Sequence, residues 1–225
     1  DLPQVHVAGA GQALCDFASM WRRRFELPIV AVTGSNGKTT VKEMVGTILR
    51  RHFAGPGEDA GVLVTWGNLN NHIGVPITLL WMRESHRAAV IEMGASARRE
   101  IARLAAIAAP GIAIITNAGP AHLGGFGGTL RDVAEAKGEL FAGLPPGSIA
   151  VINRDDPFYG YWRGLRDDIT YRSFGLSAEA DYRAVDVQAL GVQGLRFRML
   201  TPSGEIPVNL PMAGGHNVRN ALAAA

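Results

Sequence analysis

The chain has 225 residues, of which 47% are hydrophobic and 19% charged, so it carries ample apolar material for a globular core. Its net charge of +2 gives no argument for nucleic-acid binding, and its single cysteine excludes a disulfide framework. With no apolar run of about 18 residues and no signal-like start, we expect a cytoplasmic protein without membrane insertion.

Most of the chain alternates between apolar strand-like runs and helical spacing. Strands are expected at residues 29–33, 62–66, 88–93, 112–116, 149–153 and 169–174. Helices are expected at residues 13–25, 39–52, 73–82, 98–108, 130–144 and 158–165. This alternation predicts an α/β fold, with a mostly parallel sheet flanked by helices. Ligands of such sheets bind at the carboxyl ends of the strands.

From about residue 182 the pattern becomes the alternation of half-buried strands. It runs through 184–187, 195–199 and 206–210, with a Pro-Ser-Gly turn before the last segment. The pattern predicts a small antiparallel β ribbon packed beside the parallel sheet. A last helical run, 218–225, stops in mid-pattern, so we expect the chain to be cut inside a helix.

The first strand leads into Thr33-Gly34-Ser35-Asn36-Gly37-Lys38-Thr39-Thr40, which predicts a phosphate-binding loop. Gly34 and Gly37 allow backbone conformations that turn N–H groups toward an anion, and the following helix adds its dipole. We expect Lys38 to reach the terminal phosphates and Thr39 to hold their magnesium. The alternative is an ordinary strand-to-helix turn with a solvated lysine.

Lysine is scarce in this chain. Of its 22 basic residues only Lys38, Lys42 and Lys137 are lysines, so each can mark a site where a broad guanidinium does not substitute. The alternative is that Lys137 is a surface lysine retained by chance, and composition alone does not exclude this.

Polar residues follow several other predicted strands. Glu92 ends a very apolar strand and suits a magnesium ligand, although a solvated strand-end glutamate is the alternative. Asn70 and Asn71 lie in an asparagine-rich turn, which indicates a polar ligand or a simple loop with a helix cap. His122 lies in a glycine-rich loop, where a histidine is more often structural. For Asp155-Asp156 we expect capping of the next helix.

Taken in this order, the motifs resemble the Mur ligases, the ATP-dependent amide-forming enzymes of peptidoglycan precursor synthesis. They are TGSNGKTTVKEM (33–44), NLNNHIGVPITLL (68–80), EMGAS (92–96), TNAGPAHLGGFG (116–127), AKGEL (136–140), INRDD (152–156) and GGHNVRNALAA (214–224). The phosphate loop is shared with folylpolyglutamate and cyanophycin synthetases. The asparagine-rich segment, EMG and the AHLGGFG loop resemble the group of Mur ligases that adds D-alanyl-D-alanine.

The resemblance implies a domain organisation. Members of the family have a domain for the UDP-sugar, a central ATPase and a C-terminal domain. Residues 1–27 then correspond to the tail and linker of the first, and 28–225 to the central ATP-binding domain with a P-loop, truncated in its last helix. The C-terminal domain is absent, so we expect this fragment alone to be inactive. We also expect a monomer.

The resemblance also implies the residues that bind ATP. The phosphates are expected to contact Gly34, Ser35, Asn36, Gly37, Lys38, Thr39 and Thr40. Asn217 and Asn220 match positions that contact the adenine and ribose. Asn70 and Asn71 face either the γ-phosphate or the acceptor peptide, and the sequence leaves both possibilities open.

Two Mg²⁺ sites are implied in the same way. Thr39 and Glu92 match the ligands of the first, and His122 and Lys137 match residues at the second. Lys137 corresponds to a lysine that is typically carbamylated in this family, which arginine cannot replace. Lys38, His122 and Lys137 are therefore the expected catalytic residues.

The implied reaction joins D-alanyl-D-alanine to a UDP-N-acetylmuramoyl-tripeptide through an acyl phosphate. One alternative is another Mur-type amide ligase, such as a muramyl tripeptide, folylpolyglutamate or cyanophycin synthetase. The other is a P-loop nucleotide-binding module that performs no transfer chemistry.

Overall fold

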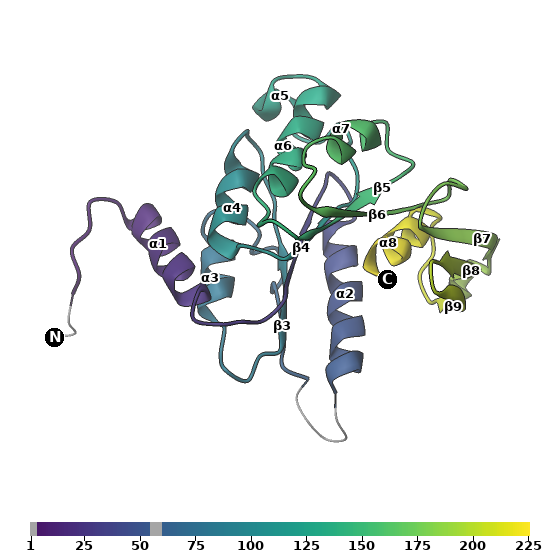
Figure 1. Cartoon of the computed structure of the whole chain (residues 1–225), viewed down its shortest axis with the longest axis horizontal. Coiled ribbons are helices and arrows are strands. Elements are labelled where there is room, and N and C mark those ends of the chain that lie inside the picture. Colours follow the sequence, from purple (N-terminus) through teal and green to yellow (C-terminus); the bar gives the residue numbers. More distant parts are fainter. Residues whose placement is uncertain (1–3, 55–59) are drawn as a thin grey trace.

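The computed structural model describes residues 4–54 and 60–225, so residues 1–3 of the expected N-terminal tail lie outside it. Its centre is a mixed sheet with the strand order β2-β3-β1-β4-β5-β6-β7-β8-β9 (Figure 1). The strands are β1 (Ile29–Thr33), β2 (Val62–Val64), β3 (Ala88–Glu92), β4 (Ile112–Ile115), β5 (Ile149–Asn153), β6 (Thr170–Gly175), β7 (Tyr182–Ala189), β8 (Leu195–Thr201) and β9 (Gly204–Leu210).

Helices cover both faces of the parallel strands, as the sequence pattern predicts. They are α1 (Ala10–Arg22), α2 (Lys38–Phe53), α3 (Gly74–Leu80), α4 (Glu100–Ala108), α5 (Leu123–Phe126), α6 (Leu130–Ala142), α7 (Tyr159–Arg163) and α8 (His216–Ala224). None of the helices within the described residues is long and apolar enough to cross a membrane.

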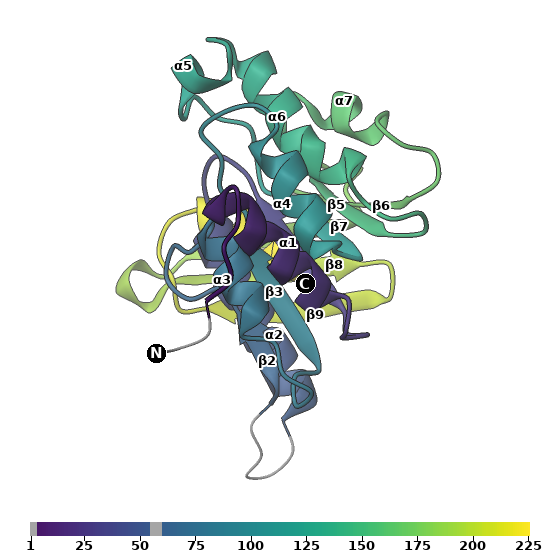
Figure 2. The same ribbon diagram turned by 90° about the vertical axis from the view of Figure 1, so that its left-hand side faces the viewer.

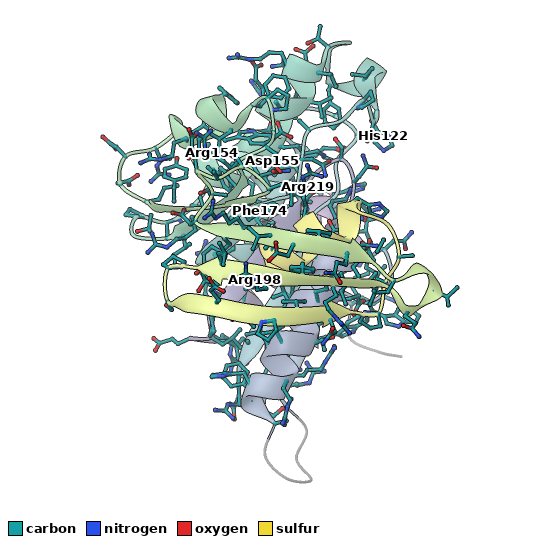
Figure 3. All side chains as sticks on the ribbon, turned by 90° about the vertical axis from the view of Figure 1, so that its right-hand side faces the viewer. His122, Arg154, Asp155, Phe174, Arg198 and Arg219 are labelled. Atoms are coloured by element: carbon teal, nitrogen blue, oxygen red, sulfur yellow. The ribbon has the colours of Figure 1, made fainter. Side chains whose placement is uncertain are left out.

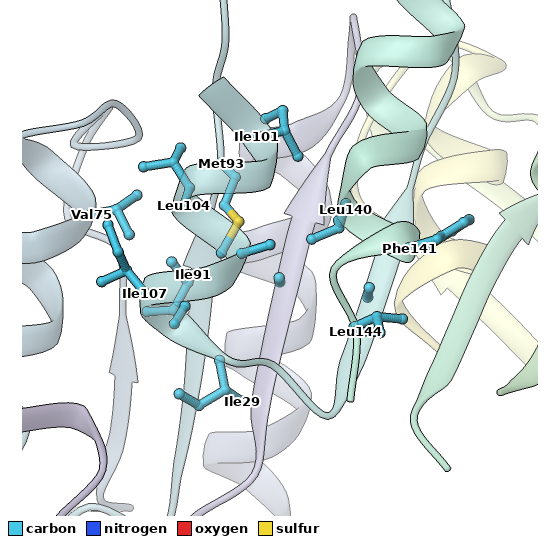
Figure 4. Close-up of a cluster of buried hydrophobic side chains, with 14 of the residues drawn as sticks. Ile29, Val75, Ile91, Met93, Ile101, Leu104, Ile107, Leu140, Phe141 and Leu144 are labelled. Atoms are coloured by element: carbon cyan, nitrogen blue, oxygen red, sulfur yellow. The ribbon is translucent and has the colours of Figure 1, made fainter. Parts of the chain in front are cut away.

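Successive strand residues point to opposite faces and so build two cores. Ile29 and Ala31 of β1 enter the core under α1, α3, α4 and α6, part of which is shown in Figure 4. Val30 and Val32 enter the core under α2 and α8. Burial of one such aliphatic side chain stabilises the fold by about 1.5–3 kcal/mol, and burial on both faces explains the continuous apolar runs.

The predicted antiparallel ribbon is present, but it continues the main sheet and does not form a separate unit. β7 pairs in parallel with β6 through Phe174 and Tyr182, and β8 then pairs antiparallel with both β7 and β9. The ribbon lies in front of the helices in Figure 3. Phe197 and Met199 of β8 share the core of α8, because every second side chain of the strand faces inward.

Two elements differ from the sequence-based expectation. The glycine-rich loop after β4 contains the one-turn helix α5, because Phe126 is buried against Val133 and Ala136 of α6. The first helix begins at Ala10 and ends at Arg22, and it packs on α3 and α4 (Figure 2). Cys15 is buried in the main core, so α1 packs against the helices that cover the sheet.

The sheet order brings three strand ends together. In β1, Val32 lies opposite Glu92 of β3, and Thr33 lies opposite Ile115 of β4. All three strands are parallel, so their carboxyl ends lie at one edge of the sheet. The predicted phosphate loop is therefore flanked by Glu92 on one side and by the loop after β4 on the other.

Candidate active site

The backbone of the predicted phosphate loop needs glycine at both expected positions. Gly34 has φ +145° and Gly37, the N-cap of α2, has φ +81°. A Cβ atom on Gly34 would overlap the Thr116 hydroxyl, and one on Gly37 would overlap the side-chain oxygen of Asn220. The two glycines thus provide positive φ and also the room for close packing against neighbouring elements.

Hydrogen bonds hold the phosphate loop against the segment that follows β4. The Ser35 and Asn36 amides each donate to Asn117 at 3.0 Å, to its carbonyl and its side-chain oxygen respectively. The Thr116 hydroxyl donates to the Asn36 carbonyl at 2.6 Å, and the Gly119 amide donates to Ser35 Oγ at 2.8 Å. The loop is therefore preorganised by the neighbouring strand.

Lys38 is the first residue of α2 and lies inside the loop. Its Nζ donates to the carbonyl oxygens of Gly34 at 2.7 Å and Ser35 at 3.1 Å. Burial lowers its pKa, and the nearby charge of Glu92 opposes that shift. The ammonium thus lies where the loop would hold a phosphate.

Glu92 contains a buried oxygen that needs a partner. The residue is 1% exposed, and Oε1 accepts a hydrogen bond from Asn70 Nδ2 at 2.8 Å. Among the described residues, Oε2 has no hydrogen-bond partner. Burying such an oxygen unpaired costs about 1–3 kcal/mol or more, which a bound cation would offset.

The carboxylate of Glu92 and the hydroxyl of Thr39 offer oxygen donors of the kind that magnesium binds. In the described part of the chain, no group of three or more His, Cys, Asp or Glu residues could hold a metal ion. Magnesium commonly uses one or two carboxylates, with phosphate and water as its other ligands. Thr39 lies exposed in the first turn of α2 and offers a hydroxyl at the same loop.

A cavity of about 700 Å³ is lined by half of the predicted site residues, and Thr39 and Glu92 are not among them. Its lining includes Gly34, Ser35, Lys38, Asn70, Asn71, His122 and Lys137. These residues come from α2, α6 and the segments that follow β1, β2 and β4. His122 has φ +57° and begins α5, and Figure 3 shows it well apart from Asp155 and Arg219.

Lys137 is an almost fully buried lysine at this cavity, with 3% exposure. Burial lowers its pKa to about 8, and the positive charge of Lys38 acts in the same direction. Its Nζ lies 5.1 Å from the centre of the Phe126 ring. Such an amine is partly uncharged near neutral pH, whereas an ordinary lysine has a pKa of about 10.4.

A family profile described as the Mur ligase middle domain matches residues 32–225, which is most of the chain. The chain belongs to the Mur ligase family. The matched span runs from the last two residues of β1 through α8, and it contains every predicted site residue of this Mur ligase domain.

Individual relatives agree with this assignment. The chain is 43% identical to a UDP-N-acetylmuramoyl-tripeptide--D-alanyl-D-alanine ligase of Haemophilus influenzae over 99% of this chain and 47% of that protein. It superposes on MurF from Acinetobacter baumannii with a TM-score of 0.91 and 38% identity, covering 98% of this chain and 47% of that one. It also superposes on a MurF ligase from Thermotoga maritima in complex with ADP, with a TM-score of 0.84 and 28% identity. This superposition covers 98% of this chain and 49% of that one. The chain thus spans about half the length of the relatives it matches.

Asn217 and Asn220 of this Mur ligase domain lie outside the described cavity lining, on the α8 side of the phosphate loop. Both are buried, and Asn220 Nδ2 donates to Asn217 Oδ1 at 2.9 Å. Asn220 also packs against Gly37. The structure therefore places Asn220 beside the phosphate loop at Gly37, and the contact of this pair with adenine and ribose stays a prediction.

The two aspartates after β5 do not occupy the cap position of the next helix, where Phe158 lies. Asp156 accepts hydrogen bonds from the Ala118 and Phe158 amides, each at 2.9 Å. Asp155 instead accepts from two amides after β6 and from Arg219 of α8. The expectation of simple capping is wrong, because both carboxylates join separate segments at the sheet edge.

Sequence reasoning did not identify the arginines that line the cavity, which are Arg98, Arg99 and Arg103. Arg98 donates to Asp132 and Glu135 of α6. Arg99 has φ +68°, and its amide donates to Glu139 at 2.7 Å. Their proximity in sequence to Glu92 was the available signal, since residues that follow a strand end lie near that edge of the sheet.

Proposed function

We propose that the whole protein is an ATP-dependent ligase that joins D-alanyl-D-alanine to a UDP-N-acetylmuramoyl-tripeptide in the cytoplasm, acting as a monomer. Residues 28–225 are its central ATP-binding domain, residues 1–27 are the tail of an N-terminal UDP-sugar domain and a linker, and a C-terminal domain completes the site. The supporting observation is a cavity lined by the predicted phosphate loop, by the buried Lys137 and by Asn70, which holds the carboxylate of Glu92 with its unpaired buried oxygen. The acceptor is inferred from relatives that carry this ligase name.

The proposed reaction has two displacements. A carboxylate is a poor acyl donor, because its leaving group would be oxide. In the first step a carboxylate oxygen of the UDP-N-acetylmuramoyl-tripeptide attacks the γ-phosphorus of ATP, and the bond from that phosphorus to ADP breaks. In the second step the amine of D-alanyl-D-alanine attacks the acyl carbon, the bond to phosphate breaks, the amine loses a proton and an amide forms.

The residues of this chain would position and neutralise the reacting groups. The loop from Gly34 to Thr40 would orient the phosphates, and Lys38 would offset the negative charge of the transferred phosphoryl group. Asn70 holds Glu92, and together with Asn71 it lines the cavity where either the γ-phosphate or the acceptor peptide would lie. No protein nucleophile is needed for this chemistry.

The phosphate loop and the cavity beside it would hold two magnesium ions in this proposal. We assign Thr39 and Glu92 to the first, and His122 with a carbamylated Lys137 to the second. Magnesium, when bound, supplies positive charge that allows the ATP and substrate carboxylate anions to approach each other. Carbamylation would turn the Lys137 amine into a carboxylate-like group, which matches the metal's preference for oxygen ligands.

Carbamylation of Lys137 should occur with a pH dependence set by its low pKa. Carbon dioxide reacts with the neutral amine, whose fraction rises as pH increases through about 8. At a constant pressure of ¹³CO₂, we expect the initial rate of carbamate formation, followed by ¹³C NMR, to reach half of its maximum near pH 8. The adduct adds about 44 Da. A spectrum of Lys137→Met provides the control, and a carbamate signal that persists undiminished in that variant contradicts the assignment.

The acceptor is tested with the full-length protein. We expect phosphate release from ATP only when both a UDP-N-acetylmuramoyl-tripeptide and D-alanyl-D-alanine are present. Turnover with a different amino acid, a folate or a cyanophycin primer, but not with D-alanyl-D-alanine, would favour another Mur-type ligase. Tight nucleotide binding without any turnover, unchanged in His122→Ala and Lys137→Met, would instead favour a binding module.

A further inference from the structure

Lys42 is a buried lysine that takes no part in the cavity described above. It is 0% exposed and lies on α2, one turn after Lys38. Residues four apart on a helix lie on the same side, so Lys42 continues the face that begins at the phosphate loop. A buried cation is costly unless its donors are paired, so its partners indicate its role.

The Lys42 ammonium joins α2 to the segment that follows β2. Its Nζ donates to the Thr65 carbonyl at 2.9 Å and to the Gly67 carbonyl at 3.3 Å. Its remaining partner is the neighbouring Glu43, whose Oε1 lies 2.8 Å away and whose side chain is 55% exposed. An ammonium has three donors, so this set satisfies it.

Two connections lead from this segment to Glu92. The Glu92 amide donates to the Thr65 hydroxyl at 2.9 Å, which links the Lys42 partner directly to the backbone of Glu92. Three residues after Gly67, the Asn70 side chain donates to Glu92 Oε1 at 2.8 Å. The Asn70 carbonyl also accepts from the Gly94 amide at 2.7 Å. Both the backbone and the carboxylate of Glu92 are therefore held by the segment that Lys42 anchors.

We propose that Lys42 is a positioning residue that fixes Glu92 relative to α2, so that magnesium-dependent nucleotide binding depends on it. The helix that carries Lys42 also carries Lys38 and Thr39, so one element sets the distance between the phosphate loop and the carboxylate. This inference rests on the proposed function, because it takes Glu92 as a magnesium ligand.

The test measures ADP affinity of the full-length protein by calorimetry, with Mg²⁺ and with EDTA. In Lys42→Met, the gain in affinity on adding Mg²⁺ should fall about 10-fold, as is typical when support of a metal ligand is lost. Affinity in EDTA should change less than about twofold, since the phosphate loop itself is intact. Amide exchange at residues 65–71 should become faster.

Glu43→Gln is the matched control. It removes the exposed charge next to Lys42 and leaves both carbonyl contacts in place, so the Mg²⁺-dependent gain should stay at the wild-type value. Thr65→Val removes the hydroxyl that accepts from the Glu92 amide. Like Lys42→Met, it should lower the gain in ADP affinity that Mg²⁺ produces. This second variant tests the proposal even when Lys42→Met does not fold.

The outcomes separate this inference from the proposed function. A wild-type protein that shows no Mg²⁺-dependent gain contradicts the magnesium site itself. A normal wild-type gain that both variants retain overturns the role of Lys42 alone. Equal losses with Mg²⁺ and with EDTA also overturn it, because they show a general effect on the fold.

Discussion

Replacing Lys38 with methionine is expected to lower kcat of the full-length protein about 10³-fold or more, with a much smaller change in KM for ATP. The ammonium lies inside the phosphate loop, where it would meet the charge that develops on the transferred phosphoryl group. Its two hydrogen bonds to loop carbonyls are worth about 1.5–3 kcal/mol each because the donor is charged, but methionine also removes the cost of burying that charge, so the fold should survive. Steady-state phosphate release gives kcat and KM, and thermal unfolding checks the fold.

Lys38→Arg should be nearly as inactive, because a broad planar guanidinium does not fit a loop built for a compact ammonium. Arg51→Met is the control, since Arg51 is exposed at the far end of the same helix and should leave kcat unchanged. A Lys38→Met protein that keeps kcat within tenfold of the wild type contradicts the role of this lysine.

Replacing Glu92 with glutamine is expected to abolish the extra thermal stability that Mg²⁺ adds to the ADP complex. A ligand at about 100 times its Kd stabilises a protein by about 2.7 kcal/mol, which raises Tm by about 5–10 °C at this size. The wild type should show this rise with Mg²⁺ and ADP. Glu92→Gln keeps an oxygen that accepts from Asn70 but loses the negative charge. Its Tm should therefore rise with ADP by the same amount whether or not Mg²⁺ is present, and its kcat should fall by at least about 10²-fold.

Glu205→Gln provides the control for a simple change of charge. Glu205 is exposed on β9, where it pairs with Arg198, and Figure 3 shows Arg198 well apart from His122 of the cavity. This variant should keep the full rise in Tm with Mg²⁺ and ADP. A Glu92→Gln protein that shows the same rise contradicts the assignment of Glu92 as a magnesium ligand.

Local patterns predicted most of the fold. The phosphate loop is local chemistry, because Gly34 and Gly37 must take positive φ next to a helix start, and the sequence alone indicates this. The expected strands and the antiparallel ribbon are confirmed. The one-turn helix α5 was not predicted. The glycines next to Phe126 disfavour a helix, and burial of Phe126 against Val133 and Ala136 offsets that cost only in the folded domain.

The expectation for Asp155 failed for a similar reason. Its partners are the Leu176 and Ser177 amides and Arg219, which lie 21 to 64 residues away in the chain. Sequence spacing indicates a helix cap within a few residues, but it does not indicate a carboxylate shared by distant segments. The same limit applies to Arg98, whose place at the cavity follows from the packing of α4 on α6.

By itself, the sequence determined the loop conformation and the strands on which the proposed phosphate site is built, because turn conformation and strand alternation are properties of neighbours along the chain. It also singled out Lys137 through the rarity of lysine. Only the tertiary structure decided that Glu92 lies beside the phosphate loop, that burial lowers the pKa of Lys137 to about 8, and that Lys42 joins α2 to Thr65. Burial, charge and hydrogen bonding depend on which strands become neighbours in the sheet, and that order is set by packing of the whole domain.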